Sequence, residues 1–218
     1  MIDKRQDKIE NILSTIQSRI SEINRRYRKG PDLYFYRKTL EMRENADNIK
    51  SFLADDYNAE ILYATLVSWD MNSRAAKMKY FDDFRNNLIS NIDLLQKLES
   101  SIEKGGFRSS KIPSLLQVLY DRMDLMLSNE KMVANSKVLH YLFPNVLIPI
   151  DRTNTILYLY GKGGTSRKRY LEAINFSFDV MESNVCWGNY LDEKWNSTIP
   201  KLIDNAIILI EGRSLNNS

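Results

Sequence analysis

The side chains best suited to catalysis stand where an apolar run gives way to a helix. Asp151 follows the run 146–150, in which Pro149 keeps the residue before it extended. We expect a helix to begin at Asp151 and end at Gly161, which places the carboxylate at a helix N-terminus. A carboxylate beside apolar residues could stabilise a developing cation or position a water molecule. Aspartate is also a preferred helix cap, and capping alone would explain this position.

Lys137 and His140 fall on one side of a helix that we expect over residues 130–143, because they are three residues apart. His140 is the single histidine of the chain and could transfer a proton near neutral pH. The alternative is a structural histidine whose ring nitrogens are hydrogen bonded within a half-apolar helix.

The run Ile148-Pro149-Ile150-Asp151-Arg152-Thr153-Asn154-Thr155, ending at Tyr160-Gly161, resembles a motif of the helix-hairpin-helix DNA glycosylase superfamily. In that all-α family, a Pro-Val-Asp step opens a helix, and the aspartate carries the base-excision chemistry. The resemblance covers residues 134–161 and implies that Asp151 is the catalytic carboxylate. Bifunctional members add a lysine one helix upstream, and Lys137 is the candidate for that role. Together with the Trp69-Asp70-Met71-Asn72 segment, the motif also looks like uncharacterised prokaryotic all-helical proteins.

A glycosylase function would give roles to several more residues. Loss of a base makes the sugar carbon cationic, which an anionic Asp151 would oppose. The flipped base must enter a pocket between aromatic side chains. Tyr63 and Trp69 could line such a pocket, although ordinary core packing is the alternative for both. The further candidates for substrate contact are Asn72, which could read a base edge, Arg74, His140 and Arg152.

Basic residues cluster beside aromatic residues at three places, a composition that suits a phosphate backbone with a stacked base. The first cluster is Arg25, Arg26, Arg28 and Lys29; the second is Arg167, Lys168 and Arg169; the third is Arg74, Lys77 and Lys79. Ser166 should begin a helix whose free N–H groups could hold a phosphate with Arg167. Each cluster could also be a solvated helix face.

The hydrophobic pattern predicts an all-α fold with about nine helices and no strand. We expect one helical domain over residues 1–218, with a possible lobe boundary near 105–110 and a long amphipathic helix over 3–28. The apolar stripe of that helix is Ile9, Ile12, Ile16, Ile20 and Ile23. It could pack on the body of the protein, or pair with a second copy or a partner protein. Single helices are expected from Asp82 to Gly105 and over 112–127.

Composition excludes several classes of protein. One histidine and one cysteine, Cys186, leave no ligand set for a zinc or iron–sulfur site, so we expect neither metal nor cofactor. No run of 18 apolar residues is present, and residues 1–10 do not resemble a signal peptide. We therefore expect a cytoplasmic protein with no membrane contact.

The preferred function is a DNA N-glycosylase, a hydrolase that removes a damaged or modified base, with DNA as its partner. A net charge of +3 is weak as a global signal for nucleic acid, so the expectation depends on the motif and the clusters. The alternatives are a nucleic-acid-binding module without activity and a helical protein-interaction module.

Overall fold

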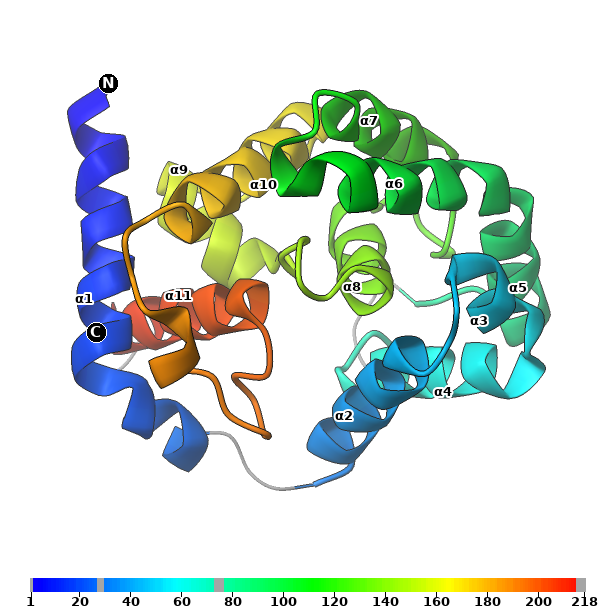
Figure 1. Ribbon diagram of the computed structural model, residues 1–218, viewed down its shortest axis with the longest axis horizontal. Helices are drawn as coiled ribbons and strands as arrows, with labels where there is room; N and C mark the ends of the chain where they lie inside the picture. The colour runs from blue at the N-terminus through cyan, green and yellow to red at the C-terminus, as the bar shows by residue number, and fades with distance from the viewer. Residues whose placement is uncertain (1, 27–29, 73–76, 215–218) are drawn as a thin grey trace. The chain divides into compact units, whose positions relative to one another are not determined.

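The computed structural model describes residues 2–26, 30–72 and 77–214 of the chain (Figure 1). These residues form eleven α-helices and no strand, which confirms the all-α class but corrects the expected number of helices, about nine. The one backbone pairing of the β type among them is an isolated antiparallel bridge between Met78 and Met126.

The chain folds as two compact units. Unit 1 comprises Met1–Arg28 and Pro144–Ser218, and unit 2 comprises Lys29–Phe143. Residues 105–110, where the sequence suggests a lobe boundary, lie inside unit 2 at the connection between two of its helices.

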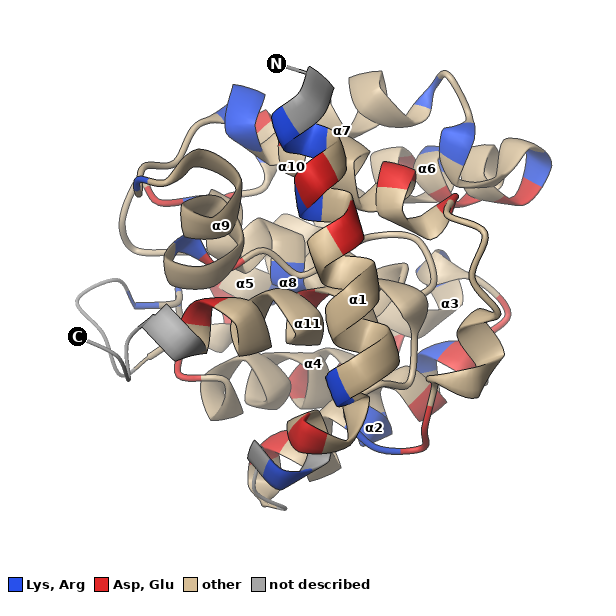
Figure 2. Ribbon diagram, turned by 90° about the vertical axis from the view of Figure 1, so that its left-hand side faces the viewer, with Lys and Arg blue, Asp and Glu red and all other residues tan. Residues whose placement is uncertain are grey.

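Unit 1 is built around its two terminal helices. Its elements are α1 (Ile2–Arg26), the π-helical turn η2 (Arg152–Ile156), α9 (Leu157–Tyr160), α10 (Arg167–Met181), the short 3-10 helix η3 (Trp187–Asn189) and α11 (Ile199–Ser214). Helix α1 packs on α11 and α10. Of the predicted stripe, Ile9, Ile12, Ile16 and Ile23 are buried, and Ile20 is half-buried. The visible face of α1 carries both basic and acidic residues (Figure 2). The stripe thus serves the core of the protein.

A pair of reciprocal hydrogen bonds joins α1 to α9 within unit 1. The Lys8 ammonium donates to the carbonyl oxygens of Tyr158 (2.6 Å) and Leu159 (2.8 Å), which the short helix α9 leaves without helical partners. The Tyr158 hydroxyl donates back to the Lys8 carbonyl at 2.7 Å. Burial lowers the pKa of Lys8 and raises the pKa of Tyr158 to about 12.

Unit 2 contains the other seven α-helices of the described chain. They are α2 (Pro31–Glu44), α3 (Ile49–Ala54), α4 (Asp56–Ser68), α5 (Phe81–Ser90), α6 (Ile92–Gly105), α7 (Ile112–Arg122) and α8 (Met132–Leu142), with a 3-10 turn η1 (Gly106–Arg108) after α6. Helix α2 packs on α4, α8 packs on both, and α6 packs on α3 and α7. All residues of α8 except Val133 are buried.

A largely buried ion pair, Glu99 with Arg43, connects four of these helices. Both oxygens of Glu99 in α6 accept from the Ile49 amide at the start of α3, at 2.9 and 3.1 Å. The Arg43 guanidinium of α2 pairs with the same carboxylate and donates at 3.0 Å to the Leu142 carbonyl at the end of α8. Besides neutralising each other, Glu99 and Arg43 therefore provide hydrogen-bond partners for backbone groups at two helix ends, the Ile49 amide and the Leu142 carbonyl.

The helix expected from Asp82 to Gly105 is in fact two helices, α5 and α6, which meet at Asn91. The Asn91 side chain is buried, and its amide group donates to the Asn87 carbonyl at 2.8 Å. An asparagine that bonds the preceding turn competes with helix continuation. The hydrophobic stripe runs through both helices, so periodicity alone does not reveal the break.

The helix expected over 112–127 ends early, at Arg122. The Lys79 amide donates to the Leu125 carbonyl (3.0 Å), and the Leu127 amide donates to the Lys77 carbonyl (2.8 Å). Residues 123–127 therefore satisfy part of their backbone by pairing with a segment far away in the sequence, which overrides their helical propensity.

Candidate functional site

Asp151 caps a π-helical turn in unit 1. The buried run 146–150 leads to it, and the turn η2 is closed by a bond from the Ile156 amide to the Asp151 carbonyl at 3.1 Å. π-Helical turns are rare in proteins, and a large share of those that occur lie at functional sites. Asp151 itself is half-buried, so its carboxylate borders solvent.

One carboxylate oxygen of Asp151, Oδ1, accepts four hydrogen bonds from its own turn. The donors are the amides of Thr153 (2.8 Å) and Asn154 (3.2 Å), the Thr153 hydroxyl (2.6 Å) and the Asn154 side-chain amide (3.2 Å). The Asp151 amide in turn donates to the Thr155 hydroxyl at 3.2 Å. Charge-assisted bonds of this kind fix a carboxylate in one orientation. The expected capping role is therefore present, and it also holds the group rigid.

The segment that follows α9 presents basic residues at the start of α10, which packs against η2 in unit 1. The Ser166 hydroxyl caps α10 by accepting from the Arg169 amide at 3.2 Å. Arg167 and Lys168 are exposed in the first turn of α10, which contains no acidic residue. Arg152 is exposed on η2. A helix N-terminus with exposed cations is a favourable place for an anion.

Arg169 has a structural role within this segment. Its guanidinium donates to the carbonyls of Gly163 (2.9 Å) and Gly164 (3.0 Å) and lies 4.6 Å from the centre of the Tyr160 ring. The Tyr160 hydroxyl bonds the Glu172 carboxylate at 2.6 Å, and burial together with this bond raises the pKa of Tyr160. The loop 161–164 is thus held against α10 by Arg169.

An aromatic cluster in unit 2 contains two of the predicted site residues. Trp69, at the end of α4, lies 5.5 Å from Tyr36 and 5.3 Å from Tyr141, measured between ring centres. His140 is buried and stacks on Tyr36 at 6.1 Å with the ring planes 8° apart. Trp69 as a residue is half-buried, and its indole nitrogen is buried.

Lys137 of α8 joins this cluster. It is 9% exposed, and its ammonium nitrogen lies 5.5 Å from the centre of the Trp69 ring and 3.5 Å from the Trp69 carbonyl oxygen. Asp70, which follows Trp69 in the sequence, has a φ of 63°, which is uncommon for a residue with a side chain. The turn after Trp69 therefore combines an unusual backbone with a buried cation.

Tyr63 and Asn72 hold the segment 78–81. The Tyr63 hydroxyl donates to the Lys79 carbonyl at 2.9 Å, and its ring packs edge-on against Phe81 and Phe84. The Asn72 side-chain oxygen accepts from the Met78 amide at 2.9 Å. Both side chains therefore have structural partners in unit 2. For Tyr63, this is the core packing that was the alternative to lining a base pocket.

The predicted site residues fall into the two units as follows. Unit 1 holds Asp151, Arg152, Ser166, Arg167, Lys168, Arg169 and Arg25, and unit 2 holds Tyr63, Trp69, Asn72, Lys137 and His140. Arg25 is exposed on α1. Arg28, Lys29 and Arg74 lie outside the described residues, as does the side chain of Arg26. Within unit 1, the structure places Asp151 and the start of α10 on elements that pack together.

The sequence did not lead us to the residues that contact Asp151 in unit 1 and Trp69 in unit 2. Thr153 and Asn154 follow Asp151 at the spacing of an Asx turn, a local signal that could have identified them. Tyr36 and Tyr141 surround Trp69 but lie 33 and 72 residues away from it, so no local pattern reveals them.

Comparison of the chain with models of known protein families, with curated proteins and with solved structures finds no match. Within the described ranges, no three or more His, Cys, Asp and Glu side chains are grouped so that they could hold a metal ion. No helix in the same ranges has the length and apolar character needed to cross a bilayer. The proposed function therefore depends on the chemistry of the residues themselves.

Proposed function

We propose that the protein is a DNA N-glycosylase that removes a damaged or modified base by hydrolysis, with Asp151 as the catalytic carboxylate. The observation that carries the proposal is the setting of Asp151: a half-buried carboxylate held by four hydrogen bonds at the start of a π-helical turn. A carboxylate fixed in this way needs no reorganisation when positive charge develops beside it.

In the proposed reaction, the bond between the sugar C1′ and the base nitrogen breaks, and the water oxygen bonds to C1′. The hydroxyl of the water stays on C1′, and the departing base takes up a proton from solvent that balances the proton lost by the water, so one water molecule is consumed for each base released. Asp151 opposes the positive charge on the sugar as the bond breaks, and its carboxylate can accept the proton that the attacking water loses. No lysine adduct is part of this reaction.

The phosphate contacts that we propose in unit 1 come from Arg152 and from the start of α10. The exposed side chains of Arg167 and Lys168 and the N-terminus of α10 favour an anion. The first turn of α10 contains no acidic residue, and Glu172 of the next turn lies 3.9 Å from the Lys168 ammonium.

The test is base release from duplexes that each carry one deaminated, oxidised or alkylated base, measured for the wild type, Asp151→Asn and Asp192→Asn. Asp192 is the matched control, because its carboxylate also accepts backbone bonds in a loop of unit 1, from Lys194 (2.7 Å) and Asn196 (3.0 Å). The proposal predicts release by the wild type and Asp192→Asn and strongly reduced release by Asp151→Asn. No release from any duplex by the wild type would contradict it.

The second candidate is a nucleic-acid-binding module without activity. The specific observation in its favour is that the four hydrogen bonds to Asp151 Oδ1 come from its own turn, as in a helix cap, while Arg152, Arg167 and Lys168 are exposed. This function predicts binding that weakens steeply with salt in the wild type and Asp151→Asn alike, without base release.

A further inference from the structure

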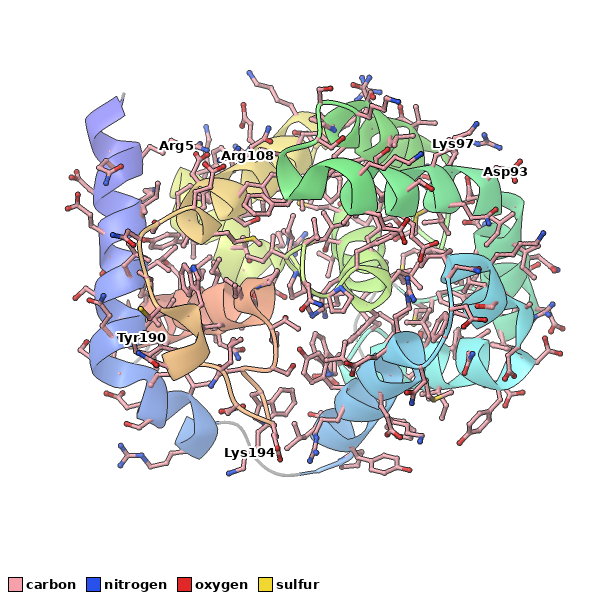
Figure 3. The ribbon with its side chains drawn as sticks, viewed as in Figure 1. Arg5, Asp93, Lys97, Arg108, Tyr190 and Lys194 are labelled. Carbon is pink, nitrogen blue, oxygen red and sulfur yellow. The ribbon has the colours of Figure 1, made fainter. Side chains whose placement is uncertain are left out.

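A groove of about 820 Å³ lies on unit 2 between α6 and α7, and none of the candidate site residues lines it. Helix α6 forms one wall, the connection 105–111 forms the end, and the first turn of α7 forms the other wall. Asp93 and Lys97 of α6, which line it, are labelled in Figure 3. Leu115 is the one large apolar side chain in the lining, and the other lining residues are charged, polar or glycine.

The groove is positively charged. Lys97, Lys104 and Lys111 line it, against the single carboxylate of Asp93, which leaves a local net charge of +2 from three positive groups and one negative group. All three lysines are exposed, and within the described part of the chain none forms an ion pair. Lys97 and Lys104 stand on the same helix and are separated by about 10 Å along its axis. The cations are therefore spread along the groove.

Neutral hydrogen-bonding groups lie between these cations. Ser100, Ser109 and Gln96 line the groove, and within the described ranges their side chains make no intramolecular hydrogen bond. Hydroxyl and amide groups, together with lysines, are the side chains that contact phosphate oxygens in nucleic-acid complexes. A row of separated cations with hydroxyl groups between them fits a chain of phosphates better than one compact anion.

We infer that the groove between α6 and α7 binds the phosphodiester backbone of nucleic acid. The inference rests on the proposed function for one point, that the chain of phosphates belongs to a nucleic acid. The groove has no aromatic lining residue on which a base could stack, so its contacts are with the backbone and do not depend on base sequence. It would add an attachment surface in unit 2 to the basic residues of unit 1.

The test is the salt dependence of duplex binding by the full chain, measured with fluorescently labelled oligonucleotides of two unrelated sequences. The variant is Lys97→Gln/Lys104→Gln/Lys111→Gln. The matched control is Lys4→Gln/Lys50→Gln/Lys194→Gln, which removes the same charge from three exposed lysines outside the groove. Each lysine that contacts a phosphate contributes about 0.9 to the slope of log affinity against log salt. Between 50 and 200 mM salt, the wild type should therefore lose about 40-fold more affinity than the groove variant.

The inference predicts this smaller slope for the groove variant with both sequences, and a slope close to that of the wild type for the control. Equal slopes for the groove variant and the wild type would overturn the inference and leave the proposed function intact. An equal reduction in the control would also overturn it, because net charge would then explain the effect. A wild type that binds anionic phospholipid vesicles but no oligonucleotide would contradict the inference and the proposed function together.

Discussion

The ammonium nitrogen of Lys137 lies 5.5 Å from the centre of the Trp69 indole ring and 3.5 Å from the Trp69 carbonyl oxygen. The lysine is 9% exposed, and its nitrogen also lies 3.6 Å from the sulfur of Met71. A cation over an indole face is attracted to the ring, and the attraction grows when both are shielded from water. Lys137 therefore acts on the turn that follows α4 and supports the backbone beside Trp69.

Together with the proposed function, this geometry predicts that the protein leaves the DNA strand intact after removing the base. A lyase needs a lysine amine that reaches the sugar C1′, and the Lys137 amine is engaged by Trp69. Strand breakage should appear only after alkali treatment of the product, and borohydride should trap no protein–DNA adduct. A trapped adduct that disappears in Lys137→Met would contradict this prediction.

Asp151 should contribute to stability through its cap as well as to catalysis. Asp151→Ala removes the acceptor of the Thr153 and Asn154 amides and should lower the free energy of unfolding by about 1 kcal/mol. Asp151→Asn keeps an oxygen at that place and should cost clearly less. Urea denaturation of the three proteins measures both differences. Equal loss in the two variants would show that charge, and not capping, stabilises the turn.

The Arg43–Glu99 pair should be the most sensitive ion pair of unit 2. Arg43→Met leaves the Glu99 carboxylate buried without its cation and removes the donor to the Leu142 carbonyl. We expect a loss of about 3 kcal/mol in the free energy of unfolding. Lys38→Met, in a more exposed pair with Glu41, is the control and should cost less than about 1 kcal/mol. Comparable losses would mean that Glu99 is not the junction of α2, α3 and α6.

The local patterns of the sequence predict much of the secondary structure, and long-range contacts explain the differences. The spacing of Ile9, Ile12, Ile16 and Ile23 predicts the buried face of α1 correctly. The break at Asn91 does not follow from the same pattern, because it depends on burial of a polar side chain. The extended course of residues 123–127 depends on a partner segment near Lys79.

The candidate site also has one part that follows from the local sequence and another that depends on long-range contacts. The cap of Asp151 can be predicted, because Thr153 and Asn154 adjoin it in the sequence. The contact of Lys137 with Trp69 joins residues 68 positions apart and follows only from the packing of α8 on α4. Hydrophobic periodicity places both residues on helices without indicating that they meet.

The Tyr158 hydroxyl should give unit 1 a sensitivity to alkali. Burial raises the pKa of Tyr158 from 10.0 to about 12, so the phenol ionises in the unfolded chain at a lower pH than in the folded protein. Its contribution to stability is complete below pH 10 and is lost as the pH rises toward 12. The free energy of unfolding of Tyr158→Phe should fall less across this pH range. Below pH 10 it should be lower than that of the wild type, because the bond to the Lys8 carbonyl is gone. Urea denaturation at several pH values measures the slopes, and parallel slopes would contradict the prediction.

The most direct test of the central claim is the single-turnover rate of base release by Asp151→Asn, on the duplex from which the wild type releases most base. The account predicts a fall of at least about 100-fold, because the substitution removes the charge that opposes the sugar cation. Circular dichroism should show an unchanged fold, and Asp192→Asn should retain the wild-type rate. A wild-type rate in Asp151→Asn would contradict the account.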